Sequence, residues 1–161
     1  MSLEVKRIDY SDETDARSLV YLLDAYAQDP MGGGHALGTE VKENLAHELL
    51  KLPHAFSIIA YVDSKPVGLI NCFEAFSTFA CKPLVNIHDL MVLEEYRGQG
   101  ISQKMLIKVE EIAREKQCCK ITIEVLSKNE NAKASYSKYG FSNYQLDTKM
   151  GHALFWEKEI V

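Results

Sequence analysis

The most constraining feature of this chain is the order of elements between residues 84 and 125. An apolar run, Leu84–Leu93, leads directly into a turn that contains Gly98 and Gly100. Apolar residues then recur every three or four positions with charged residues between them, as in a helix that packs one face on a sheet: Ile101, Met105, Leu106, Val109, Ile112 and Ala113. Residues 120–125 alternate polar and apolar, as in a strand. This order predicts a βαβ unit with parallel strands.

The segments before this unit predict further strands and helices. Glu4–Tyr10 has the pattern of a short strand, and apolar residues from Leu19 to Tyr26 have helical spacing, with a helix end expected near Asp29 and Pro30. Residues 31–38 include four glycines, so we expect a flexible loop there before a second helix through Val41–Leu50. Residues 56–62 and 67–73 predict a β-hairpin, because Asp, Ser, Lys and Pro separate them.

The segments after the unit predict one helix and two strands. Asn129–Tyr139 is expected to be helical and to stop at Gly140, the residue type that most readily takes the left-handed conformation. Phe141–Tyr144 and Ala153–Ile160 are expected to be strands. The whole order predicts an α/β (α+β) fold in which helices flank a mixed central sheet. A chain of 161 residues without a linker or repeat is expected to be one domain, residues 1–161.

Charge and cysteine usage narrow the class of protein. Eighteen Lys and Arg against 23 Asp and Glu give a net charge of −5, so we expect neither nucleic acid nor a membrane surface as partner. The apolar runs are shorter than the roughly 18 to 20 residues that span a bilayer. The four cysteines lack zinc-site spacing, so we expect buried reduced thiols, no metal and a cytoplasmic location: Cys72, Cys81, Cys118 and Cys119.

The turn at Arg97–Ser102 is the strongest candidate for a binding site. It lies where a strand ends and a helix begins, so the first backbone N–H groups of that helix point outward and favour an anion. Glycines at 98 and 100 allow close approach of a ligand to the backbone. A Walker loop is excluded because no GxxxxGK occurs, and a dinucleotide fingerprint fails because Gln103 stands where its third glycine should be.

The turn resembles the coenzyme A loop of the GCN5-related N-acetyltransferase (GNAT) superfamily. That pattern is Gln or Arg, two residues, Gly, one residue, then Gly or Ala; Arg97 and Gly100 match it, and Ser102 replaces the last small residue. A second motif of the superfamily follows in the right order. It consists of Asn, an Ala three residues on, a Tyr seven residues after the Asn, and Gly-Phe: Asn129, Ala132, Tyr136, Gly140 and Phe141.

The resemblance implies an acetyl-CoA-dependent N-acetyltransferase, with acetyl-CoA as cosubstrate and no metal. It implies that the backbone of Leu90 and Val92 binds pantetheine and that Tyr136 protonates the leaving thiolate. Asp89 occupies one position of the acidic pair found in the polyamine-acetylating branch, so it is our second candidate for the chemistry. The expected donor-binding residues are Leu90, Val92, Arg97, Gly98, Gln99, Gly100, Ile101, Ser102 and Asn129.

Several alternatives stay open at this point. Strand alternation places His88 and Asp89 on opposite faces, and Glu124 is a third candidate for base or amine recognition. The acceptor is expected to be a small polyamine-like amine, with a protein or peptide amine as the alternative. A non-catalytic acyl-CoA-binding module would keep the same scaffold without turnover. The oligomeric state is open as well, and a homodimer is compatible with the chain.

Overall fold

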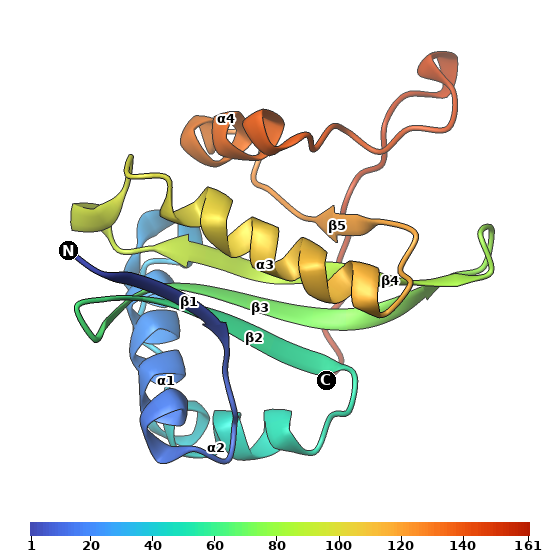
Figure 1. Cartoon of the computed structure of the whole chain (residues 1–161). Coiled ribbons are helices and arrows are strands. Elements are labelled where there is room, and N and C mark those ends of the chain that lie inside the picture. Colours follow the sequence, from blue (N-terminus) through green and yellow to red (C-terminus); the bar gives the residue numbers. More distant parts are fainter. The chain divides into compact units, whose positions relative to one another are not determined.

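The sheet of this protein is mixed, as the sequence predicts, and contains five strands (Figure 1). In the computed structural model, which describes residues 1–161, the spatial order of the strands follows the chain. Strands one to four pair antiparallel, and the fifth runs parallel to the fourth. The strands are β1 (Leu3–Arg7), β2 (Ala55–Val62), β3 (Lys65–Ser77), β4 (Lys82–Val92) and β5 (Ile121–Ile123).

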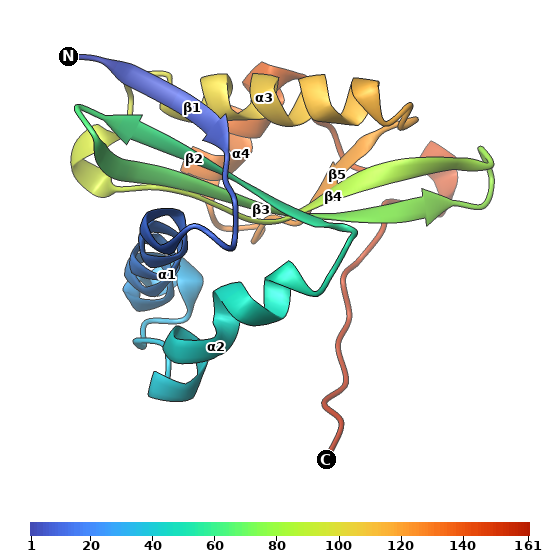
Figure 2. The same ribbon diagram turned by 60° about the horizontal axis from the view of Figure 1, so that its bottom comes forward.

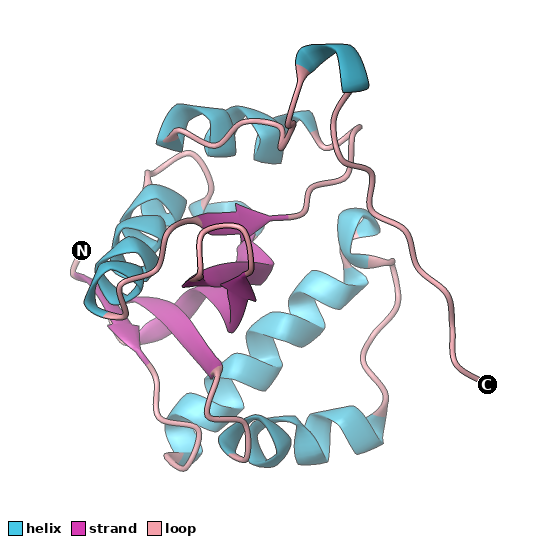
Figure 3. Cartoon of the chain, turned by 90° about the vertical axis from the view of Figure 1, so that its right-hand side faces the viewer, coloured by secondary structure: helices cyan, strands magenta, loops and turns pink.

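Helices cover both faces of this sheet. Helices α1 (Glu13–Gln28) and α2 (Thr39–Leu50) lie on one face, and α3 (Ile101–Glu115) lies on the other (Figure 2). Short 3₁₀ turns precede α2 at Pro30–Gly32 and follow β4 at Glu94–Tyr96. The α/β character expected from the sequence is therefore confirmed, and Figure 3 shows the magenta strands between helices.

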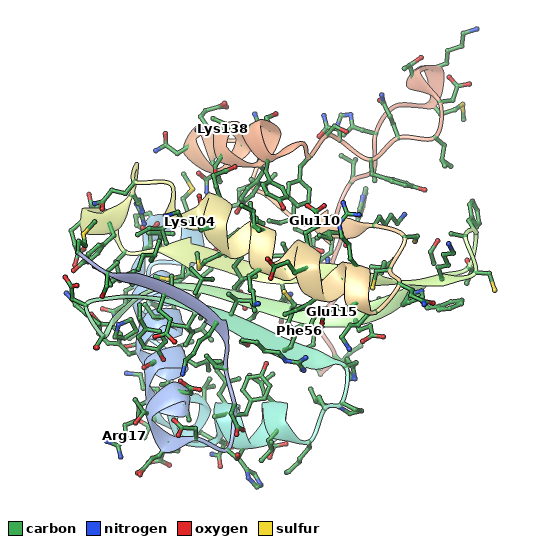
Figure 4. The ribbon with its side chains drawn as sticks, in the orientation of Figure 1. Arg17, Phe56, Lys104, Glu110, Glu115 and Lys138 are labelled. Atoms are coloured by element: carbon green, nitrogen blue, oxygen red, sulfur yellow. The ribbon has the colours of Figure 1, made fainter.

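Local sequence explains where these helices begin, end and pack. The Asp12 carboxylate accepts a hydrogen bond from the Asp15 N–H at 2.9 Å and caps α1, which ends before Asp29 and Pro30 as predicted. All six apolar residues predicted to form the packing face of α3 are buried. Charged residues such as Lys104, Glu110 and Glu115 alternate with them along the helix (Figure 4). The core is therefore built by the helical and strand periodicities of the sequence.

Residues 124–161 form a second compact unit, described here by itself. Its helix α4 (Glu130–Tyr139) ends at Gly140, whose φ of 115° is the left-handed conformation predicted for it. The expected strands at Phe141–Tyr144 and Ala153–Ile160 are wrong, because both segments are irregular. A strand needs a ladder of partners, and the recorded backbone hydrogen bond between these segments is a single one, from the Ala153 N–H to the Tyr144 carbonyl at 3.0 Å.

The cysteines only partly follow the expectation of buried thiols. Cys72 is buried in β3, but Cys81 and Cys119 are exposed and Cys118 is half-buried, so the expectation is wrong for the last three. Cys81 lies in the turn between β3 and β4, and Cys118 and Cys119 lie between α3 and β5, where turns approach the surface. All four are free thiols. No helix has the length and apolar character needed to cross a bilayer, and no group of three or more metal-ligating side chains occurs.

Candidate active site

Strand β4 has two halves with different surroundings. Residues 85–87 pair with β5 on one side and with β3 on the other. Beyond Ile87 the pairing with β5 stops, while the pairing with β3 continues to Val92. The second half of β4 therefore presents one edge of its backbone to something other than a neighbouring strand of the sheet. We call residues 88–92 the open half of β4.

A β-bulge at His88 determines which backbone groups face that edge. Asn71 of β3 is opposite Asp89, but the next residue, Cys72, is opposite Ile87, so His88 is the extra residue. On the far side of the bulge the Leu93 N–H donates to the Val67 carbonyl at 2.9 Å. Because N–H and C=O groups alternate in direction along a strand, the backbone polar groups of Leu90 and Val92 point away from β3. These are the two residues expected to bind pantetheine.

Arg97 folds back onto the end of this strand. Its Nε donates to the Val92 carbonyl at 2.9 Å, and its Nη2 lies 3.3 Å from Oδ2 of Asp29, at the end of α1. The guanidinium is about half exposed, so the pair with Asp29 is partly screened by solvent. These contacts hold the cation between the open half of β4 and the C-terminal end of α1.

The turn after Arg97 has the backbone geometry that its glycines allow. Gly98 and Gly100 have φ values of 75° and 77°, and a Cβ atom at either position would meet nothing within 4 Å. Gly100 is also the N-cap of α3, which has no side-chain cap and no acidic residue in its first turn. The first N–H groups of α3 therefore start at an uncapped, glycine-lined turn, which favours an anion. The structure thus brings together the predicted loop residues Arg97, Gly98, Gln99, Gly100, Ile101 and Ser102, of which Ile101 is buried and anchors the helix.

Asp89 is half-buried and lies close to the end of α1. Its Oδ2 accepts a hydrogen bond from Nδ2 of Asn71 at 3.0 Å. Burial raises the pKa of the Tyr26 phenol, and the negative charges of Asp89 and Asp29 add to that rise. We call Asp89, Asp29 and Tyr26 the acidic region; its Asp29 carboxylate is paired with Arg97, so Asp89 supplies the net negative charge.

The expectation that His88 and Asp89 point to opposite faces is wrong. The His88 ring lies edge-on to Phe73 with centroids 5.7 Å apart, whereas Asp89 binds Asn71, two residues earlier on the same strand. Residues two apart on a regular strand share a face, so His88 and Asp89 share one as well. The bulge at His88 is the physical reason, since it interrupts the alternation.

Tyr136 and Asn129 belong to the second unit. Tyr136 is buried, and its ring is 6.1 Å from that of Phe141 in an edge-on arrangement. The Asn129 side chain accepts a hydrogen bond from the Ala132 N–H at 3.2 Å and caps α4. The Asn and Ala of the second motif therefore have a local structural role in starting this helix.

The structure does not favour Cys72 as a nucleophile or Glu124 as the group for base or amine recognition. Burial raises the pKa of the Cys72 thiol, and the nearby charge of Asp89 adds to this, so the reactive thiolate is disfavoured. Glu124 follows β5 and is exposed. Asp89 is therefore the acidic group that the structure places beside the open half of β4.

Some polar residues near Asp89 were not found from the sequence. Ser57 and Asn71 lie fully within apolar strands, and both are buried. Tyr26 and Asp29, at the end of α1, lie in the segment around residues 26–37 where the family resemblance implies acceptor contacts, but neither was named as a site residue. A signal was present for the strand residues, because a polar side chain inside an apolar run has to find a partner or a function. Nothing in the sequence alone showed which partner.

The fold and the turn define an α/β protein with a candidate anion site, and comparison with known proteins names the family. The acetyltransferase (GNAT) family matches residues 16–141, so the chain belongs to this family of N-acetyltransferases, which use acetyl-CoA. A Bacillus subtilis protein proposed to be a ribosomal-protein-alanine N-acetyltransferase is 24% identical over 121 residues, which are 71% of this chain and 76% of that protein.

Two further similarities add to this. Thialysine N-epsilon-acetyltransferase of Caenorhabditis elegans is 30% identical over 93 residues, which are 58% of this chain and 56% of the worm protein, so the match spans little more than half of that relative. The solved structure of an integron cassette protein from V. cholerae superposes with a TM-score of 0.80, covering 99% of this chain and 93% of that one at 21% identity. At this identity the structural likeness concerns the fold alone.

Proposed function

We propose that this protein transfers the acetyl group of acetyl-CoA to a small cationic amine. The observation that carries the proposal is the continuity of the open half of β4 with the Arg97–Gly100 turn and the uncapped start of α3. The backbone of Leu90 and Val92 is suited to bind an extended pantetheine by strand-like hydrogen bonds. Arg97 and the N–H groups around Gly100 to Ser102 are suited to the pyrophosphate. Gln99 and Asn129 complete the proposed donor-binding set.

The acceptor amine has to lose a proton before it attacks the thioester. An alkyl amine with a pKa near 10.4 is only about one part in 2,500 neutral at pH 7. In our proposal Asp89 binds the ammonium form beside Tyr26, and the net charge of −5 favours its approach. The ammonium group first loses one proton to solvent, and the neutral amine attacks the carbonyl carbon of the thioester. The C–S bond then breaks, and the nitrogen loses its second proton to solvent or to a nearby base.

Tyr136 is the proposed proton donor to the departing coenzyme A thiolate. A phenol of pKa about 10 is protonated at pH 7 and can transfer its proton to a thiolate as the C–S bond breaks. Support for this role comes from the spacing of Asn129, Tyr136 and Gly140. The family match covers residues on both sides of position 123, which supports the proposal that residues 1–161 work as one N-acetyltransferase domain.

Transfer is proposed to be direct, without an acetyl-enzyme. A covalent route needs an activated nucleophile, and the buried Cys72 thiol has a raised pKa. Direct transfer predicts intersecting double-reciprocal plots when both substrates are varied. Parallel plots, or an acetyl-cysteine that forms and decays at the turnover rate, would show the covalent route instead.

A protein N-terminal amine is the second candidate acceptor. It is favoured by the similarity to the Bacillus subtilis relative, whose proposed substrate is the alanine of a ribosomal protein. The small cationic acceptor is favoured by the acidic region of Asp89, Asp29 and Tyr26, and by the similarity to an enzyme named for thialysine, a small amine. The two candidates differ in what the acceptor must present besides its amine.

An acceptor panel with detection of released thiol tests the proposal. The panel holds acetyl-CoA with a diamine, thialysine, a peptide that begins with alanine, and an aromatic amine that is uncharged at pH 7. We expect the highest kcat/KM for the diamine or thialysine. A preference for the peptide would select the second candidate, and binding of acetyl-CoA without thiol release on any amine would select a non-catalytic acyl-CoA-binding module.

A further inference from the structure

Four polar side chains form a hydrogen-bonded row across the sheet, and this row ends at Asp89. The Tyr10 hydroxyl is 2.7 Å from Oγ of Ser57, which donates to Oδ1 of Asn71 at 2.6 Å. Nδ2 of Asn71 in turn donates to Oδ2 of Asp89 at 3.0 Å. Ser57 and Asn71 are opposite each other on β2 and β3, and Asn71 is opposite Asp89 on β4. The hydrogen-bonded row therefore follows paired positions on β2, β3 and β4.

The hydrogen bonds of this row all run in one direction, with each donor on the Tyr10 side and each acceptor on the Asp89 side. Ser57 has a single hydroxyl proton, and that proton goes to Asn71, so the Ser57 oxygen accepts from the Tyr10 hydroxyl. The Asp89 carboxylate determines the orientation of the Asn71 amide, because a flipped amide would turn its oxygen toward a group that only accepts and would lose the hydrogen bond to Asp89. Each donor in the row polarises the next, and the last N–H points at a carboxylate.

The burial of polar side chains in this row indicates that the row has a functional role. Ser57 is 0% exposed and Asn71 is 4% exposed, in a part of the sheet where their neighbours Phe56, Ile58 and Ile70 are fully apolar. Polar groups gain little stability when they replace well-packed apolar pairs in such a place, even when they are hydrogen-bonded. A departure from the apolar pattern that is satisfied from end to end and finishes at a candidate site is the expected sign of a functional constraint.

The surroundings of Asp89 show how the hydrogen-bonded row can act on its carboxylate. The charge of Asp89 contributes to the raised pKa of Tyr26 on α1 and of Cys72 on β3. Burial raises the pKa of both, so both are neutral at pH 7, and His88 of the same strand packs on Phe73. Asn71 is the neutral donor that holds one carboxylate oxygen, Oδ2.

We propose that Asn71 is a positioning residue for acceptor recognition, which is oriented by Ser57 and Tyr10 and holds the Asp89 carboxylate in place to bind a cationic amine. The inference rests on the proposed function, because it requires Asp89 to bind the acceptor. Asn71 itself touches neither substrate. Its effect on the acceptor passes entirely through Asp89.

A double-mutant cycle on acceptor choice tests this inference. Asn71→Leu removes the donor to Asp89 at nearly constant volume, and we expect KM for a diamine to rise about tenfold, the worth of one hydrogen bond to a charged group. KM for an aromatic amine that is uncharged at pH 7 should change less than about twofold, because it makes no ion pair. In an Asp89→Asn background, Asn71→Leu should have no further effect on the diamine-to-arylamine ratio.

Ser57→Ala keeps the test decisive if Asn71→Leu does not fold. It removes the hydrogen bond that the amide oxygen accepts, and we expect a rise in diamine KM of about threefold with the same selectivity. The control is Asn86→Ala, which removes an asparagine of β4 whose Nδ2 donates to Thr122 at 3.0 Å, and it should leave the ratio unchanged. Amine-independent changes in KM, or additive effects in the Asp89→Asn background, would overturn the inference.

The failure of the proposed function would be seen separately. A wild-type enzyme that releases no thiol with the diamine would refute acetyl transfer to this acceptor class before any variant is made. The side-chain amide resonances of Asn71 in ¹⁵N–¹H spectra give a readout that needs no turnover. We expect them to move in both Ser57→Ala and Asp89→Asn, and unmoved resonances in both variants would overturn the hydrogen-bonded row itself.

Discussion

The two halves of β4 differ in what their backbone is bonded to. Residues 85–87 have strands on both sides, while residues 88–92 are paired only with β3. The first half holds the sheet together, and the second half joins the turn at Arg97–Gly100. One strand therefore has a structural half and an open half that we propose binds the donor, and a single bulge at His88 separates them.

This difference shows how a sheet can offer a backbone site without an exposed outer strand. The edge of an open strand can add an extended ligand as if it were another strand. Here the open edge is next to β5 rather than at the end of the sheet, and its length is limited by the bulge on one side and the Arg97 turn on the other. Binding by such an edge uses few side chains, so side-chain variation in the open half should be tolerated better than changes to its backbone.

The largest effect is expected at Tyr136, which lies outside the open half. Our proposal gives proton transfer to this residue and only binding to the open half. Tyr136→Phe removes one hydroxyl and keeps the ring against Phe141. We expect kcat to fall by roughly 10²- to 10⁴-fold, as for a lost general acid, with unchanged affinity for coenzyme A. Steady-state kinetics at saturating substrates and calorimetry check the two parts. A folded variant with wild-type kcat, where chemistry limits the rate, would mean that the proton comes from elsewhere.

The next effect tests the turn that ends the open half. Gly100→Asp places a carboxylate where the pyrophosphate is proposed to bind, and like charges about 6 Å apart near a surface repel by about 3 kcal/mol. We expect coenzyme A affinity to fall about 100-fold by calorimetry. Gly100→Asn is the matched control, because Asn has a similar size and tolerates a φ near 77°. Equal losses in the two variants would point to backbone strain instead of charge.

A pair of proline variants compares backbone groups that face opposite ways in the open half. Leu90→Pro removes an N–H that points away from β3, so the sheet should survive and coenzyme A should bind about tenfold more weakly. Met91→Pro removes an N–H that faces β3 and should lower the free energy of unfolding by at least about 1 kcal/mol more. Denaturant unfolding and calorimetry measure both. Similar stability losses in the two variants would contradict the assigned directions.

The smallest effect is expected in the structural half. Asn86→Ala removes the hydrogen bond from Nδ2 of Asn86 to Thr122 of β5. We expect the free energy of unfolding to fall by about 1 kcal/mol, while kcat and KM stay within about twofold of the wild type. Denaturant unfolding and steady-state kinetics check this. A kinetic effect larger than its stability effect would remove the distinction between the two halves.

Much of the fold follows from local patterns in the sequence. The β4–α3–β5 unit and the end of α4 at Gly140 were predictable, because periodicity and a left-handed glycine are properties of short segments. The strands expected at 141–144 and 153–160 were not, since their residues have strand character but a strand requires a partner that no local pattern specifies. The extension of β3 to Ser77 has the same origin, because it depends on pairing with Lys82 of β4.

The candidate site divides along the same line. Arg97, Gly98 and Gly100 could be found from sequence because they are consecutive and their chemistry is local. The row from Tyr10 to Asp89 could not, because it joins four segments that only the strand register brings together. The bulge at His88 escaped as well, and with it the shared face of His88 and Asp89. Its presence depends on how two strands are paired, which neither strand shows alone.

The bulge at His88 also has a consequence for how this family member can change during evolution. The turn between Ser77 and Lys82 lies before the bulge, so insertions there would alter only the far end of a hairpin. One residue gained or lost between His88 and Arg97 would reverse the directions of the backbone groups in the open half. Groups that now face β3 would face away from it, and the groups of Leu90 and Val92 would face β3. Length variation among homologues should therefore be common in the first region and absent from the second, whatever acceptor each homologue uses.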